Sequence, residues 1–71
     1  PKTLLQEKMQ AGKRPLPIYE VIEVSGDQHN QQFQIRCLLE DSGQNSEGTG
    51  SSRRRAEQDA AAKMLERIGH D

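Results

Sequence analysis

The feature that most restricts the fold of this chain is an alternating pattern in residues 32–40. Every second position there is apolar, through Phe33, Ile35, Cys37 and Leu39. Successive side chains of a β-strand point to opposite faces, so this spacing predicts a strand with one buried face. Such a strand needs hydrogen-bonded neighbours and a covering layer, which the rest of the chain must supply.

A second strand is predicted in residues 18–25. The segment is rich in β-branched and aromatic side chains, which favour strands. Its alternation is imperfect, because Glu20 and Glu23 interrupt the apolar positions. We expect Tyr19 and Val21 to point inward.

A short third strand is predicted in residues 47–51. Glycine-containing turns at residues 26–27 and 41–43 separate the three strands. Because these connections are short, consecutive strands must run antiparallel.

The beginning of the chain is predicted to form a short helix over residues 3–11. Thr3 is the expected N-cap, since its hydroxyl can accept a backbone N–H. Leu5 and Met9 are four residues apart and therefore share one face of the helix. Gly12 is expected to end the helix in a left-handed conformation.

A longer helix is predicted over residues 52–68, with Ser51 or Ser52 as its N-cap. Its apolar stripe has helical spacing and consists of Ala56, Ala60, Met64 and Ile68, widened by Ala61 and Leu65. The small alanines allow this helix to lie close to a sheet.

These elements predict one α+β domain over residues 1–71, in the order α-β-β-β-α. Two helices are expected to pack on one face of a three-stranded antiparallel sheet. Cys37, the single cysteine, is expected to be a buried packing residue in a protein of a reducing compartment. No apolar run approaches the length of a membrane span.

The charge distribution is more informative than the total. The net charge is -1 with a pI of about 6.1, which by itself disfavours nucleic-acid binding. Three consecutive arginines, Arg53, Arg54 and Arg55, nevertheless stand in the first turn of the second helix. The helix dipole opposes cations at that position, so the pattern indicates an anion-binding surface. Gly48 and Gly50 just before it would allow a tight turn close to a ligand. A solvated helix face is the alternative.

Two further groups of polar side chains are candidates for binding. One face of the first helix presents amides, a hydroxyl and a carboxylate from Thr3, Gln6, Glu7 and Gln10. These groups suit contacts in a shallow minor groove, and they suit contact with water equally well. His29 lies in a predicted turn, where it can enter a groove or remain an ordinary surface residue. No catalytic constellation and no metal-binding group is present in the pattern, so no catalytic residue, metal or cofactor is expected in this chain.

The whole chain resembles the double-stranded RNA-binding domain. The matching stretches are KTLLQE (residues 2–7), PIYEVIEVSGDQHNQQF (17–33) and GTGSSRRRAEQDAAAKML (48–65). The resemblance implies that Thr3, Gln6, Glu7 and Gln10 meet one minor groove of an RNA duplex. It implies that His29 meets the next minor groove, and that Arg53 and Arg54 hold the phosphates between them. Glu57 departs from the lysine common in the family, and Ser51 or Arg55 is expected to substitute for it.

The amino-acid sequences of these motifs are similar to those in the C-terminal domain of proteobacterial ribonuclease III. That resemblance implies a cytoplasmic parent endoribonuclease that processes rRNA and mRNA precursors with Mg²⁺ and is a homodimer through its nuclease domain. This chain alone is then expected to be a monomer that binds double-stranded RNA without cleaving it. The alternative is a protein–protein interaction module on the same fold, because some members of the family lose RNA binding.

Overall fold

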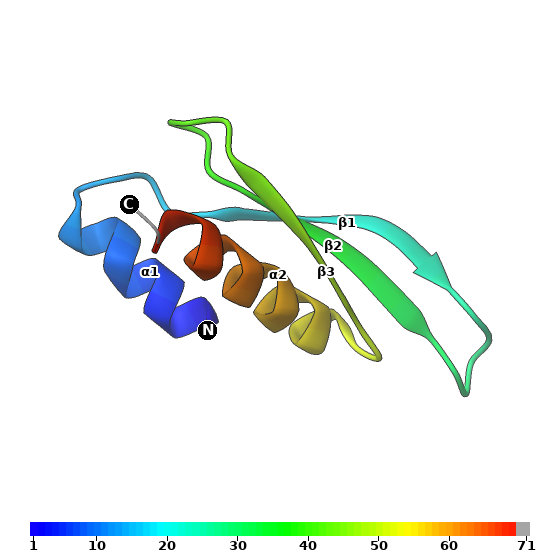
Figure 1. Ribbon diagram of the computed structural model, residues 1–71. Helices are drawn as coiled ribbons and strands as arrows, with labels where there is room; N and C mark the ends of the chain where they lie inside the picture. The colour runs from blue at the N-terminus through cyan, green and yellow to red at the C-terminus, as the bar shows by residue number, and fades with distance from the viewer. Residues whose placement is uncertain (70–71) are drawn as a thin grey trace.

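The computed structural model describes residues 1–69, which form two helices and three strands. They are α1 (Lys2–Ala11), β1 (Ile18–Ser25), β2 (Gln32–Leu38), β3 (Asn45–Gly50) and α2 (Arg53–Ile68). The strands form one antiparallel sheet in the order β1-β2-β3, and both helices lie on the same side of it (Figure 1). This confirms the predicted α+β fold. Residues 70 and 71 of the predicted domain lie outside the described residues.

The core lies between α2 and the sheet, and α1 packs beside α2. The predicted alternation in β2 and the predicted stripe on α2 both face this core. Its buried cluster consists of Leu5, Met9, Cys37, Leu39, Ala60, Ala61, Met64 and Ile68, with Tyr19 and Leu65 packed against it. Full burial of a side chain such as Leu5 contributes about 1.5–3 kcal/mol.

Helix α2 lies very close to β3 at two positions of the strand, where only glycine leaves enough room. A Cβ on Gly48 would collide with the backbone N of Ala60 and would lie 2.5 Å from the carbonyl O of Ala56. A Cβ on Gly50 would lie 2.7 Å from the backbone N of Ala56. Ser46 strengthens the contact, because its buried hydroxyl donates a 2.7 Å hydrogen bond to the Ala60 carbonyl. The two glycines therefore make room for α2, and the expectation that they also allow a ligand to come close stays a prediction.

The imperfect alternation of β1 results from a β-bulge. Val21 pairs with Ile35, but the next pair joins Glu23 to Gln34, so that Ile22 has no partner. Tyr19 is partly buried against the core, as expected. Val21 pairs with the buried Ile35 and so lies on the core-facing side of the sheet, as expected, although its side chain is 41% exposed. It lies on an edge strand, while α2 packs on β2 and β3.

Both ends of α1 differ from the prediction. The helix begins at Lys2 with Pro1 as N-cap and has no side-chain cap, so Thr3 does not cap it. At its other end Gly12 has φ -87°, and it is Lys13 that adopts the left-handed conformation, with φ 55°. The Arg14 N–H then donates to the carbonyl of Met9, which closes the chain reversal after the helix.

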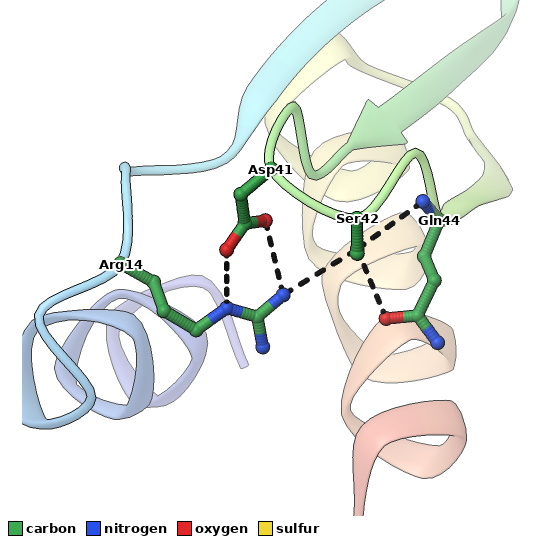
Figure 2. A network of polar contacts seen from close by, with 4 residues as sticks. All are labelled: Arg14, Asp41, Ser42 and Gln44. Carbon is green, nitrogen blue, oxygen red and sulfur yellow. Dashed lines mark hydrogen bonds and ion pairs between the residues drawn. The ribbon is translucent and has the colours of Figure 1, made fainter.

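A polar network ties that reversal to the turn between β2 and β3 (Figure 2). Arg14 donates through Nε to Asp41 Oδ2 at 2.7 Å and through Nη2 to Asp41 Oδ1 at 3.0 Å. It also reaches Ser42 Oγ at 3.4 Å, and that hydroxyl bonds both the backbone N–H and the amide oxygen of Gln44. The segment after α1 is thereby fixed to the turn between β2 and β3.

We predict that the Arg14–Asp41 pair makes stability depend on pH. The hydrogen bond from Arg14 lowers the pKa of Asp41 in the folded state. A lowered carboxyl pKa stabilises the fold above the ordinary aspartate pKa of about 3.9, and this stabilisation is lost as pH falls through the lower folded-state value. Asp41→Asn should therefore lower the urea midpoint at pH 7, and the difference from the unaltered chain should vanish near pH 2.

Asp59 also has a lowered pKa, but it does not affect the difference between Asp41→Asn and the unaltered chain. Asp59, whose pKa is lowered first by the N–H of Thr49, is present in both proteins. A difference between the two midpoints that stays constant from pH 7 to pH 2 would contradict the assignment to Asp41.

Candidate nucleic-acid interface

Three segments that carry the predicted binding residues follow one another along one side of the molecule. The start of α1, the connection before α2 and the turn between β1 and β2 line the lower edge of Figure 1. The start of α1 is held to α2 itself, since Lys2 N–H donates to Gln58 Oε1 at 2.8 Å, and Ser51 before α2 lines a hollow together with residues 28–32. The fold therefore brings the three segments that carry the candidate groups to one side of the molecule.

The first group lies on the solvent side of α1. Leu5 and Met9 point into the core, whereas the four predicted residues are exposed: Thr3, Gln6, Glu7 and Gln10. Their side chains have no hydrogen bond or ion pair with any of residues 1–69. This face offers free donors and acceptors to a ligand.

The second group is the turn after β1, whose shape is set by Gly26 and by the side chain of Asp27. Gly26 has φ +87°, a conformation that side chains other than glycine rarely adopt. Asp27 Oδ1 accepts the N–H groups of His29 and Asn30, each at 2.9 Å. His29 is exposed on this fixed turn and lines the hollow that reaches Ser51. Asp27 was not among the predicted binding residues, although an aspartate after a turn glycine often bonds the backbone two residues on.

The third group surrounds the first turn of α2. Ser52 is the N-cap, and its hydroxyl accepts the Arg55 N–H at 3.2 Å. Of the two predicted N-caps, Ser51 and Ser52, the second is therefore confirmed. Arg53 and Arg54 are exposed, and within residues 1–69 no acidic side chain pairs with them. With no acid in this turn, two guanidinium groups and the positive end of the helix dipole act together.

Arg55 and Glu57 have partners of their own. Arg55 Nη1 donates to Ser51 Oγ at 3.2 Å. Glu57 forms a 2.7 Å ion pair with Lys2, so its charge is compensated within the protein. Glu57 stands where the family commonly has a lysine, but its negative charge acts on Lys2 as well as on the candidate surface.

Other chemistry finds little support in the described part of the chain. Burial raises the pKa of the Cys37 thiol, which keeps it protonated and fits its role in packing. Among residues 1–69, no group of three or more His, Cys, Asp or Glu side chains is placed to hold a metal ion. Neither helix there has the length and apolar character needed to cross a membrane.

Comparison with known proteins agrees with this geometry. The sequence model of the family described as "Double-stranded RNA binding motif" matches residues 1–68. The protein named ribonuclease 3 from Alkalilimnicola ehrlichii is 57% identical over 68 residues, which cover 96% of this chain and 30% of that protein. The ribonuclease 3 of Shewanella halifaxensis is 53% identical over 66 residues, covering 93% and 29%. The chain thus spans less than a third of the length of these relatives.

A solved structure has the same fold. It comes from work on Arabidopsis HYL1 and its implications for miRNA processing, and it superposes with a TM-score of 0.81 at 34% identity. The match covers 96% of this chain and 94% of the other.

Proposed function

Since this chain belongs to the double-stranded RNA binding motif family, we propose that it binds RNA duplexes through the surface formed by its three exposed polar groups. Thr3, Gln6, Glu7 and Gln10 enter one minor groove. His29 and its turn enter the next minor groove. Arg53 and Arg54, with Ser51, hold the phosphates of the intervening major groove.

The observation that carries this proposal is that the three segments bearing exposed polar groups lie on one side of the molecule. The interface predicted for an A-form duplex needs contacts at two successive minor grooves and at the phosphates between them. The molecule is elongated, with extents of 40 × 18 × 18 Å, and the three segments that carry these groups follow one another on one side of it (Figure 1). The exposed arginines supply the local positive charge that the net charge of -1 does not.

We further propose that the chain is the RNA-binding part of a longer endoribonuclease of the ribonuclease III type, which processes rRNA and mRNA precursors in the cytoplasm. The relatives named ribonuclease 3 support this, since this chain matches about 30% of their length. Cleavage, Mg²⁺ and homodimer formation then belong to the remaining part of that protein. This chain by itself is proposed to be a monomer without a cofactor.

The test is a titration of one sequence as duplex RNA, duplex DNA and RNA–DNA hybrid. Recognition of A-form shape and 2′-hydroxyls predicts tightest binding to duplex RNA, weaker binding to the hybrid and weakest binding to DNA. Equal affinity for all three would show a purely electrostatic surface and contradict the proposal.

Exposed apolar residues on β1 favour a second candidate function, a protein–protein interaction module. Val21, Ile22 and Val24 are 40–49% exposed on an edge strand. This alternative predicts no measurable affinity for duplex RNA in the same titration. Glu57 does not favour this alternative, because its charge is compensated by Lys2.

A further inference from the structure

The first residue of α1, Lys2, makes polar contacts with α2 and a ring contact with β1. Its backbone N–H donates to Gln58 Oε1 at 2.8 Å, and its ammonium Nζ donates to Glu57 Oε1 at 2.7 Å. The same ammonium lies 5.0 Å from the centroid of the Tyr19 ring. Lys2 thus contacts both α2 and β1, which are distant from it in the sequence.

These contacts replace local features that α1 lacks. The helix has ten residues, no side-chain cap and no acidic residue in its first turn. Helices this short are marginal unless other parts of the protein stabilise them. Its buried side chains are Leu5, the fourth residue of the helix, and Met9, so the three residues before Leu5 have no buried side chain to anchor them. Gln58 therefore caps α1 from another helix by accepting one of its orphan N–H groups.

The Lys2–Glu57 pair is also better shielded from water than an ordinary surface pair. The Glu57 side chain is 19% exposed and that of Lys2 39%. Partial burial reduces screening and strengthens the attraction between the two charges. The pair can therefore hold a defined geometry.

The position of the pair connects two groups of the proposed interface. Lys2 precedes Thr3, the first exposed residue of the α1 face. Glu57 is four residues after Arg53 and so lies one turn further along the same face of α2. A shift at this contact would change the distance between the minor-groove residues of α1 and the phosphate-binding arginines.

We propose that Glu57 and Gln58 are positioning residues for RNA recognition, which set the first turn of α1 relative to Arg53 and Arg54. This inference rests on the proposed function and identifies residues that act without touching RNA. Glu57 then promotes binding of a polyanion although it is itself negatively charged.

The experiment compares Glu57→Gln with the unaltered chain in binding to duplex RNA. Loss of the pair is expected to weaken binding about fivefold, and the salt slope should not change because Arg53 and Arg54 still bind phosphates. If Glu57 acts only through its charge, its removal beside the arginines will instead tighten binding, and this result would overturn the inference.

A matched control and a double variant complete the test. Glu66→Gln removes the same charge from the exposed last turn of α2 and should leave the affinity unchanged. Lys2→Gln combined with Glu57→Gln should weaken binding no more than Glu57→Gln alone, because both changes break one contact. A smaller salt slope in Lys2→Gln would show that Lys2 binds phosphate itself and would also overturn the inference.

Two further measurements separate positioning from unfolding and from a failure of the proposed function. Affinities are compared at a temperature where circular dichroism shows every variant fully folded, and the amides of residues 2–6 should shift in the NMR spectrum of Glu57→Gln. Absence of such shifts contradicts the inference. If the unaltered chain does not bind duplex RNA, the proposed function fails; if it binds and Glu57→Gln binds equally well, only this inference fails.

Discussion

Gly48→Ala is expected to lower the free energy of unfolding by about 3 kcal/mol or more. The added methyl group would collide with the backbone of α2 at Ala56 and Ala60, where no side chain can rotate away. A domain of this length has roughly 4–10 kcal/mol of stability in total. A urea titration followed by circular dichroism should show a much lower midpoint, and the start of α2 with its arginines should move away from the sheet.

Gly12→Ala is the matched control for this change. Gly12 has φ -87°, and its added Cβ would make only ordinary contacts, the nearest at 3.6 Å with the Arg14 side chain. Its midpoint should stay near that of the unaltered chain. A Gly48→Ala protein as stable as the Gly12→Ala protein would contradict the close packing of α2 on β3.

Replacing both Arg53 and Arg54 with glutamine is expected to weaken binding to duplex RNA by about 100-fold or more, since a hydrogen bond to a charged group contributes about 1.5–3 kcal/mol. The slope of log K against log salt should fall by about 2, one for each lost phosphate contact. The fold should not suffer, because both side chains are exposed and the helix dipole disfavours cations in this turn. Weaker binding with unchanged or higher stability distinguishes a binding role from a structural one.

Arg67→Gln controls for the loss of charge in this experiment. Arg67 is exposed in the last turn of α2, at the opposite end of the helix from Arg53. The change should leave the affinity nearly unaltered. If the double variant keeps the affinity and the salt slope of the unaltered chain, Arg53 and Arg54 do not bind phosphate.

The parts of the fold that depend on local periodicity could be predicted from the sequence. The alternation through Ile35, Cys37 and Leu39 predicted a strand with one buried face, and all three are buried. The alanine stripe predicted a helix lying close to the sheet, and Ala56 and Ala60 are buried there. In both cases the pattern within one element was sufficient, because the core selects one face of each element.

Features that depend on contacts between distant residues could not be predicted in the same way. Thr3 has the chemistry of an N-cap, but Gln58 accepts an N–H of α1 from 56 residues away. The bulge at Ile22 changes which side chains of β1 share a face, and no local pattern locates it. Glu57 was interpreted only as a missing cation, because its partner Lys2 is adjacent only in the folded protein.

The candidate binding residues were predicted in part from residue chemistry and in part from resemblance. The conflict between the arginines and the helix dipole pointed to Arg53 and Arg54. The face of α1 and His29 had equally good interpretations as ordinary surface, and their assignment to RNA contacts stays a prediction. The structure adds that these residues are exposed, and that the start of α1 and the turn between β1 and β2 lie along one side of the molecule.

An NMR titration of the ¹⁵N-labelled chain with an RNA duplex of about 16 base pairs tests the central claim most directly. The account predicts that amides of residues 3–10, 27–30 and 51–54 shift together and saturate at the same RNA concentration. Shifts confined to one of these segments, or concentrated on the exposed strand β1, would contradict a single surface that spans two minor grooves.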